Sequence, residues 1–321
     1  MTRWAGGIVA ALFGMVAVAL AQGAYPSRFV TVIVPFGAGG NSDVLGRIFA
    51  ERMGQRLSQQ FVIENRAGAG SNTGLTALAR ATPDGYTIGI ATSSMTINPH
   101  IYKDKMPFDP VKDFQPLLLI AKQPNVVVVN NSIPAKTLPE LIEFLKVNQN
   151  ESYGSSGIGT SLHLCMEMIK QQTGVKITHV PNRSSAAVLQ DVIGGHTRIA
   201  CDNTSTALAQ VKAGTLRGIA VSSLQRLPDA PELPTIAETL PGFEALTWHS
   251  YVAPAGIPKE ALDKLTAELK AVFAEADVQR RLKELSVAPS GITGAAFHDF
   301  IKSEVVKWGP IIEKARITAP N

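Results

Sequence analysis

The sequence lacks a strong excess of charge of either sign. Its 321 residues carry 30 Lys and Arg against 26 Asp and Glu, a formal net charge of +4. Nucleic-acid-binding proteins concentrate Lys and Arg on one face or along one helix, and no basic cluster stands out in this chain. We therefore expect no nucleic acid partner.

Beyond its first residues the sequence also lacks an apolar run of about 20 residues, the length that a membrane-spanning helix needs. Residues 1–21 combine a basic start at Arg3, an uncharged run over Trp4–Leu20 and the small-x-small site Ala19-Leu20-Ala21. This pattern is typical of a secretory signal peptide, and a retained anchor is the alternative. Residues 1–21 are therefore interpreted as a signal peptide, which predicts an exported protein.

Cysteine is scarce, with Cys165 and Cys201 as the only two. In an exported protein an even pair can form a disulfide. One lies on a predicted helix and the other ends a predicted strand of the same α/β unit, where a 2-1-3 parallel strand order brings them close. The sequence predicts a disulfide, and two buried free thiols are the alternative.

The glycine-rich turns lack the residues of nucleotide-binding motifs. Thr160 stands where a P-loop has lysine, and Ser42 and Thr73 interrupt two matches to G-x-G-x-x-G. The chain also lacks G-x-S-x-G, H-E-x-x-H and C-x-x-C, and its six histidines show no metal-ligand spacing. We expect no catalysis, cofactor or metal. Scattered triads escape such a scan, so an exported hydrolase remains an alternative.

What the sequence does contain is a strand–helix alternation that runs through two similar stretches. This predicts an α/β fold built of largely parallel sheets flanked by helices. The predicted strands are Val30–Pro35, Phe61–Ile63, Tyr86–Ala91, Leu117–Asn130 with an interruption at 122–124, Glu151–Ser155, Val175–Val180, Thr197–Cys201, Leu216–Val221 and Phe243–Pro254. The predicted helices are 44–57, Leu75–Ala81, Leu138–Val147, Leu162–Gln172, Ala186–Ile193, Thr206–Ala213, Lys259–Ala274, Asp277–Leu285 and Gly294–Ile317.

The length and the repeated alternation indicate two lobes. We assign residues 22–122 with 226–321 to lobe 1 and residues 123–225 to lobe 2. Two extended stretches, near Lys122 and near Trp248, would connect them as hinges. In open α/β sheets ligands bind at the carboxyl ends of strands, so the ligand is expected in the cleft between the lobes.

One glycine turn in each lobe precedes a helix. The first glycine turn is VPFGAGGNSD (Val34–Asp43) and the second is GSSGIGTS (Gly154–Ser161). A helix start has unpaired N–H groups and a partial positive charge, and glycine lets the backbone approach a ligand. With the hydroxyls of Ser42, Thr160 and Ser161, the two turns predict an anion site suited to a carboxylate. Two well-capped βα connections are the alternative, and a valine at Gly39 or Gly157 should block a ligand.

The residues also resemble a known family over Tyr25 to about Ile317. The resemblance rests on YPSRFVTVIVPFGAGGNSD, VIENRAGAGSNTG, TPDGYTIGIAT, INPHIY, YGSSGIGTSLHL, THVPNRSSAAVLQDVIGG, DNTS, TIAETLPGFEALTW and VAPAGIP, in this order. The chain resembles the substrate-binding proteins of tripartite tricarboxylate transporters, the TctC or Bug family. The resemblance implies a periplasmic type II binding-protein clamshell that holds a ligand carboxylate, with the help of ordered waters, between the two glycine turns.

Carried over residue by residue, the resemblance implies a ligand-binding set and some departures. Asp43 and His163 occupy typical family positions, and Asp43 is expected to cap its helix because a carboxylate would repel the ligand. The family commonly has Tyr-Lys-Gly at 182–184 and an aromatic residue and glycine at 249–250; this chain has Asn-Arg-Ser and His-Ser there. The implied ligand-binding residues are Phe36, Gly37, Ala38, Gly39, Gly40, Asn41, Ser42, Asp43, Ser93, Ser155, Ser156, Gly157, Ile158, Gly159, Thr160, Asn182 and Asp202.

The function expected from the sequence is that of a periplasmic solute receptor for a small carboxylate. It would act as a monomer and deliver its ligand to integral membrane subunits of a transporter; presentation to a sensor kinase is the alternative. The expected distal wall comprises Ser93, Ser94, Asn182, Arg183, Asp202, Asn203 and His249. Arg183 could pair with a second carboxylate and Asp202 could meet a protonated amine. This wall has one permanent cation, which favours a mono- or dicarboxylate over citrate.

Overall fold

The computed structural model describes residues 25–318, and the signal peptide predicted for residues 1–21 lies outside them. The strands are β1 (Val30–Val34), β2 (Phe61–Asn65), β3 (Thr87–Thr92), β4 (Phe114–Asn130), β5 (Ser152–Ser155), β6 (Thr178–Pro181), β7 (Ile199–Asn203), β8 (Leu216–Val221), β9 (Leu246–Pro254) and β10 (Ala288–Ile292). The helices are α1 (Asn41–Leu57), α2 (Asn72–Ala79), α3 (Ser94–Tyr102), α4 (Leu138–Val147), α5 (Ser161–Thr173), α6 (Ser185–Ile193), α7 (Thr204–Lys212), α8 (Lys259–Phe273), α9 (Ala276–Glu284) and α10 (Gly294–Ala315).

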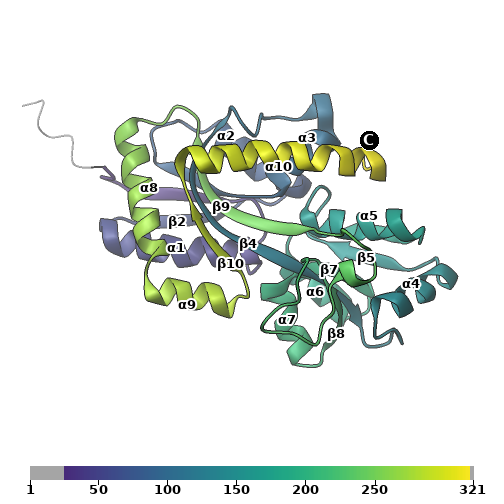
Figure 1. The fold of residues 1–321 in the computed structure, drawn as a ribbon. Helices are drawn as coiled ribbons and strands as arrows, with labels where there is room; N and C mark the ends of the chain where they lie inside the picture. Colours follow the sequence, from purple (N-terminus) through teal and green to yellow (C-terminus); the bar gives the residue numbers. More distant parts are fainter. Residues whose placement is uncertain (1–24, 319–321) are drawn as a thin grey trace, which may run out of the picture.

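These elements form two lobes, each with a sheet between helices (Figure 1). The sheet of lobe 1 has the order β2-β1-β3-β9-β4-β10, and that of lobe 2 the order β6-β5-β7-β4-β8. Strands such as β1, with the apolar run VTVIV, are buried on both faces because helices cover both sides of the sheet. The predicted two-lobed α/β architecture is confirmed.

Each sheet is mixed rather than largely parallel. The β1–β2, β1–β3, β5–β6 and β5–β7 pairs are parallel, which gives both lobes the expected 2-1-3 core. The pairs that involve β4 and β9 are antiparallel. Strand β4 crosses from one lobe to the other and pairs in both sheets, whereas β9 pairs only in the sheet of lobe 1 and begins where the chain returns from lobe 2.

Strand β4 runs unbroken through the predicted interruption at 122–124. Its first part, Phe114–Pro124, pairs with β9, and its second part, Asn125–Asn130, pairs with β7 and β8. Pro124 has no N–H group to donate to a neighbouring strand. It stands where β4 exchanges β9 for β7 and β8 as partners, so this position tolerates the missing donor. The sequence signal at 122–124 therefore marks the passage between lobes rather than the end of a strand.

Two elements escaped the sequence analysis, helix α3 and strand β10. Most of α3 is buried, including the polar residues Ser94, Thr96 and Asn98, and it contains Pro99. A helix buried on several sides has no polar stripe that would reveal its period. Strand β10, APSGI, contains Pro289 and a positive-φ glycine and lies at a sheet edge against β4.

Helices α3 and α10 connect the cores of the two lobes. Ile97 and Ile101 of α3 and Trp308 and Ile312 of α10 belong to the same buried cluster as the side chains of α4 and α5 in lobe 2. Figure 1 shows α10 extending from lobe 1 over α5. Lobe 2 is therefore supported by two lobe 1 helices in addition to the crossing strands.

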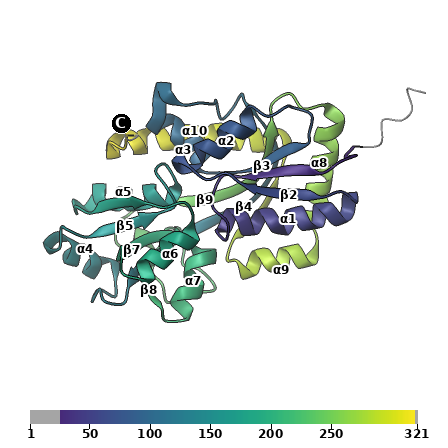
Figure 2. The same cartoon turned by 180° about the vertical axis from the view of Figure 1, so that it is seen from behind.

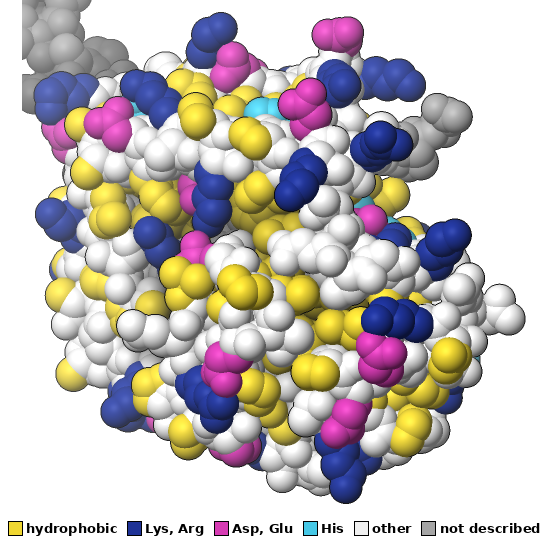
Figure 3. Space-filling view, turned by 45° about the vertical axis from the view of Figure 1, so that its right-hand side comes forward, with side chains coloured by type: hydrophobic (Ala, Val, Ile, Leu, Met, Phe, Trp, Pro, Cys, Tyr) yellow, Lys and Arg dark blue, Asp and Glu magenta, His cyan; other side chains and the backbone are white. Residues whose placement is uncertain are grey.

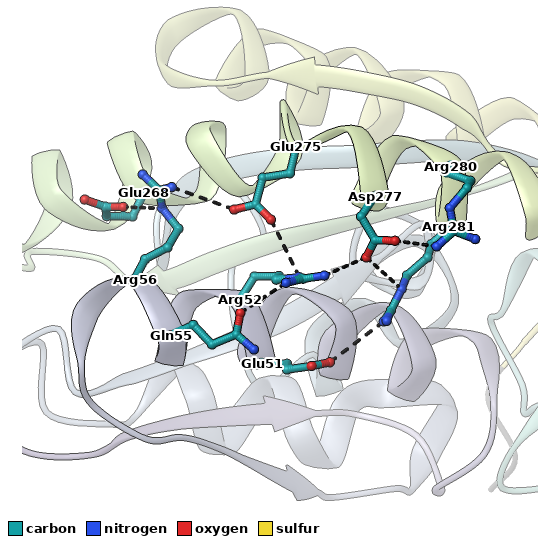
Figure 4. A network of polar contacts seen from close by, with 9 residues as sticks. All are labelled: Glu51, Arg52, Gln55, Arg56, Glu268, Glu275, Asp277, Arg280 and Arg281. Carbon is teal, nitrogen blue, oxygen red and sulfur yellow. Dashed lines mark hydrogen bonds and ion pairs between the residues drawn. The ribbon is translucent and has the colours of Figure 1, made fainter.

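An ion-pair network joins α1 to α8 and α9 on the outside of lobe 1 (Figure 4). Arg52 contacts Glu275 at 3.6 Å and Asp277 at 2.6 Å, and Arg56 contacts Glu268 at 2.7 Å. Exposed ion pairs contribute little individually. Together these ion pairs connect α1 to α8 and α9. The N-terminal end of α1, at Asn41, lies at the cleft.

Cys165 and Cys201 are free thiols in the structure, so the predicted disulfide is not formed. Both are buried in the apolar core of lobe 2, where burial, and next a hydrogen bond with Cys165, raises the pKa of the Cys201 thiol well above its ordinary value. Disulfide formation needs a thiolate. The two thiols nevertheless belong to the same buried core cluster of lobe 2, as the expected strand order implies.

Acidic and basic side chains are interspersed on the face that Figure 3 shows, without a patch of one sign. This agrees with the nearly balanced composition. Within residues 25–318 none of the helices has the length and apolar character to cross a membrane.

Candidate ligand-binding site

A pocket lies between the lobes, beside the strands that cross between them. With the lobes as they stand, the free volume between its walls is about 20 Å³, room for about one water molecule. Its lining comes from both lobes and includes strand β9. The lining residues are Phe36, Gly40, Asn41, Ser42, Thr92, Ser93, Ser156, Thr160, Ser161, Leu162, Ser185, Asn203, Thr247 and His249.

Five helices begin at this pocket. They present to it Asn41 of α1, Ser93 before α3, Ser161 of α5, Ser185 of α6 and Asn203 before α7. Each start adds unpaired backbone N–H groups and a partial positive charge. None of the lining residues is Asp, Glu, Lys or Arg. The pocket is therefore suited to an anion that is held by neutral donors and helix dipoles.

Asp43 shapes the first glycine turn and does not line the pocket. Its Oδ2 accepts a hydrogen bond from the Gly39 N–H at 3.0 Å, and its Oδ1 accepts one from Asn65 Nδ2 at 3.0 Å. Burial alone would raise the pKa of Asp43, but hydrogen bonds from Arg47, Gly39 and Asn65 outweigh it and lower the pKa. The carboxylate thus holds the turn before α1 rather than capping the helix as expected, and it lies outside the pocket lining.

The second glycine turn is supported by buried side chains. Thr160 Oγ1 donates to the Gly157 carbonyl at 2.8 Å and accepts from the His163 N–H at 3.3 Å, which caps α5. The Gly159 N–H points to His163 Nδ1 at 3.3 Å. Burial lowers the pKa of His163 to about 4, so this neutral ring accepts the hydrogen bond. His163 therefore positions the turn from behind.

The two lobes touch around the pocket, so the structure is a closed arrangement. The Gly37 N–H donates to the Arg183 carbonyl across the cleft at 2.9 Å. Gly70, in a third glycine turn, lies so close to Ile158 of lobe 2 that a Cβ at Gly70 would be 1.7 Å from the Ile158 carbonyl oxygen. Figure 2 shows the start of α1 next to α6 of lobe 2.

His249 forms part of the pocket floor on β9. Its Nε2 lies 2.8 Å from Asn41 Nδ2 and its Nδ1 lies 3.4 Å from Ser42 Oγ. Complete burial lowers the pKa of His249 to about 3, so the ring is neutral at physiological pH. His249 therefore supplies hydrogen bonds rather than positive charge.

The structure brings part of the predicted set to the pocket. Phe36, Gly40, Asn41, Ser42, Ser93, Ser156 and Thr160 line it, together with Asn203 and His249 from the expected wall. The remaining predicted residues lie outside the lining: Gly37, Ala38, Gly39, Asp43, Ser94, Ser155, Gly157, Ile158, Gly159, Asn182, Arg183 and Asp202.

Two of those glycines, Gly157 and Gly159, lie against the other lobe. A Cβ at Gly157 would meet Gly70 Cα at 3.1 Å, and one at Gly159 would meet Asn98 Oδ1 at 1.7 Å. A Cβ at Gly39 would have only Ala186 Cβ near it, at 3.9 Å. Gly157 and Gly159 therefore let the lobes close on each other, whereas the helix starts that follow the turns line the pocket.

Three of the seven polar residues expected at the distal wall, Asn182, Arg183 and Asp202, lie outside the pocket lining. Asn182 donates from Nδ2 to Asp191 Oδ2 at 2.9 Å, and Arg183 is exposed. Asp202 is fully buried, and its Oδ1 accepts from the Asn203 N–H at 2.7 Å and from Thr206 Oγ1 at 2.7 Å. Asp202 therefore holds the turn that precedes α7, and no permanent cation lines the pocket.

Four lining residues were missed from the sequence: Thr92, Leu162, Ser185 and Thr247. Ser185 follows its cap Ser184 at the start of α6, so the pair of serines before an apolar helix was an available signal. Thr92 is the last residue of β3, and Thr247 lies near the start of β9. Both reach the pocket through the pairing of their strands in the sheet, and the sequence contains no signal for this pairing.

Asp202 gives the first testable prediction, a pH dependence of stability. Burial raises its pKa from 3.8 to about 6, against hydrogen bonds from Thr206 and Ser185. A raised pKa favours the protonated folded state, so this contribution is complete below pH 4 and is lost as the pH rises through 6. The neutral side chain of Asp202→Asn lacks this loss. Between pH 4 and 7.5 we expect the unfolding free energy of Asp202→Asn to gain about 2–3 kcal/mol relative to the unmodified protein. Urea denaturation measures it; a difference that is constant with pH would contradict it.

Two α/β lobes joined at crossing strands, with a pocket of helix starts and neutral polar side chains between them, define a solute-binding protein of the periplasmic clamshell type. The model of the tripartite tricarboxylate transporter family receptor matches residues 45–317, so the chain belongs to this family. Its members of known structure are binding proteins rather than enzymes.

Three solved structures of high similarity agree with this assignment. The periplasmic binding protein BugD is 34% identical, with a TM-score of 0.88 over 92% of this chain and 99% of its own. Rpa4515 from R. palustris, solved with adipate, is 33% identical, with a TM-score of 0.87 over 92% and 99%. MatC from Rhodopseudomonas palustris, solved with malate, is 27% identical, with a TM-score of 0.86 over 90% and 100%.

Proposed function

We propose that this protein is a periplasmic receptor that binds a small organic carboxylate between its lobes and delivers it to the integral membrane subunits of a tripartite tricarboxylate-type transporter. The observation that carries this proposal is the convergence of five helix starts on a pocket without charged side chains. Such a pocket compensates the charge of an anion by backbone N–H groups and dipoles. The adipate and malate complexes of the two R. palustris proteins support a carboxylate.

The ligand is a mono- or dicarboxylate rather than a tricarboxylate. Each further carboxylate needs its own donors or cations when it is taken out of water. The lining holds none of the chain's Lys or Arg residues, and Arg183 is exposed outside it. The backbone groups of the helix starts and a few hydroxyls are enough for one or two carboxylates.

The protein binds its ligand as a monomer whose lobes move about the crossing strands. The lobe boundary expected at 225/226 moves to about 245/246, because Leu233, Ile236 and Phe243 pack in the cores of lobe 2. The lobes then comprise residues 22–122 with about 246–321 and residues 123 to about 245, and export by the leader at residues 1–21 brings the protein to the periplasm. The change of partners along β4 at Pro124 supports a hinge at this point. Closure then buries the ligand between the first and second glycine turns.

A thermal-shift screen over organic acids tests the proposed function. A ligand at 100 times its Kd that binds only the folded protein raises stability by about 2.7 kcal/mol. We expect the largest rise in Tm from mono- or dicarboxylates, and none from neutral sugars of similar size. A screen in which no carboxylate raises the Tm would contradict the receptor function. A dominant response to citrate would contradict only the proposed number of carboxylates.

A further inference from the structure

A chain of buried hydrogen bonds runs behind the pocket and has a fixed direction. The Ser286 backbone carbonyl, which can only accept, receives the Thr204 hydroxyl proton over 3.2 Å. Thr204 Oγ1 must then accept from Gln123 Nε2, which lies 3.0 Å away. This orientation turns Gln123 Oε1 towards Asn41, whose Nδ2 donates to it. A backbone atom thus determines how two amide side chains are oriented.

The order of donors and acceptors in this chain of hydrogen bonds also determines the protonation of two side chains at the pocket, His249 and Ser42. Asn41 Nδ2 also donates to His249 Nε2 at 2.8 Å, so the proton of the neutral ring is on Nδ1. Nδ1 then donates to Ser42 Oγ, 3.4 Å away, and the Ser42 hydroxyl proton remains free for a ligand. Both protons of the Asn41 amide are used within the protein.

Asn41 Oδ1 is left as an acceptor without a partner in the protein. The residue is 3% exposed, lines the pocket and begins α1, and its Oδ1 is buried without a hydrogen bond. A buried acceptor without a donor is unfavourable. A carboxylate oxygen cannot supply the donor. A ligand with a proton-bearing group next to its carboxylate would supply the missing donor.

We propose that the ligand is a hydroxy acid whose hydroxyl donates to Asn41 Oδ1, and that Gln123 and Thr204 are positioning residues for this recognition. The proposal rests on the proposed carboxylate function. The donor is a hydroxyl rather than an ammonium, because the positive ends of five helices surround the pocket and none of its lining residues is acidic.

Calorimetry with pairs of acids that differ by one hydroxyl tests the proposal: malate against succinate, and lactate against propionate. A ligand without the hydroxyl leaves Asn41 Oδ1 unpaired, so we expect the hydroxy acid of the preferred chain length to bind about 10- to 100-fold tighter. Equal affinity within both pairs would overturn the proposal, since a water would then serve Oδ1 equally well. Tighter binding of aspartate than of malate would also overturn it.

Thr204→Val and Thr204→Ser form a matched pair of variants for the positioning role. Thr204 is fully buried and outside the pocket lining. Valine keeps its shape but removes the hydroxyl that orients Gln123, so the preference for the hydroxy acid should fall towards onefold. Serine keeps the hydroxyl and should retain the preference. An unchanged preference in Thr204→Val would overturn the positioning role.

These outcomes separate the two proposals. If no organic acid binds, the carboxylate function fails. If hydroxy acids and their deoxy analogues bind with equal affinity, the carboxylate function holds and hydroxyl recognition fails. Should Thr204→Val not fold, the comparison of acid pairs on the unmodified protein still decides the question.

Discussion

Replacement of Gly70 by alanine is expected to weaken ligand binding at least about 100-fold while leaving both lobes folded. Gly70 belongs to lobe 1, and a Cβ there would lie 1.7 Å from the carbonyl oxygen of Ile158 in lobe 2. Atoms cannot approach so closely, so the closed arrangement cannot form. The ligand then loses the hydrogen bonds of one lobe, each worth about 1.5–3 kcal/mol with a charged partner, and every 1.4 kcal/mol is tenfold in affinity.

Gly214→Ala is the matched control. Gly70 and Gly214 have φ of +59° and +71°, so alanine costs roughly 1–2 kcal/mol of backbone energy at both sites. No atom lies within 4 Å of a Cβ at Gly214. Calorimetry should give full affinity for Gly214→Ala, and small-angle scattering should show Gly70→Ala remaining open at saturating ligand. Wild-type affinity in Gly70→Ala would contradict the closed arrangement as the ligand-bound state.

Replacement of Ser93 by aspartate is expected to reduce carboxylate affinity about 100- to 1,000-fold. Ser93 lies in the pocket lining at the start of α3, it is 1% exposed and its Oγ has no partner in the protein. A carboxylate there would face the ligand's charge. Two like charges 4 Å apart repel by about 4 kcal/mol at an effective dielectric constant of 20.

Ser93→Asn separates charge from size. Asparagine and aspartate have the same shape and both are favourable before a helix, so both variants should fold. We expect Ser93→Asn to lose much less affinity than Ser93→Asp when the two are titrated with the same acid at pH 7.5. Equal losses in the two variants would show that the pocket responds to volume and that its preference for an anion has another origin.

The elements with a clear period were predictable from the sequence. Helix α4 was expected at Leu138–Val147 and is found there, because Thr137 caps it and one face of it is apolar. The alternation of strands and helices likewise indicated two α/β lobes, and the first and second glycine turns indicated where helices start at the cleft. These features follow from local backbone preferences and from burial, which leave a pattern in neighbouring residues.

The composition of the pocket was not predictable in the same way. Ser185 and Thr247 line the pocket because helices and strands far apart in the sequence converge there. Arg183 lies outside the lining, and its backbone carbonyl accepts a hydrogen bond from the Gly37 N–H. The neutrality of His249 follows from complete burial, and the orientation of Asn41 follows from a backbone carbonyl at Ser286.

The fold class and the family could thus be read from the amino-acid sequence, and the helix starts could be predicted as an anion site, since each of these depends on short contiguous stretches. Which side chains meet at the pocket, which glycines lie between the lobes and which way the amides point became clear only from the folded chain. Those properties depend on contacts between residues such as Asn41, Gln123 and Thr204, which are more than 80 positions apart. A contact of that kind leaves no periodic signal in a single sequence, because only the folded chain brings its two partners together.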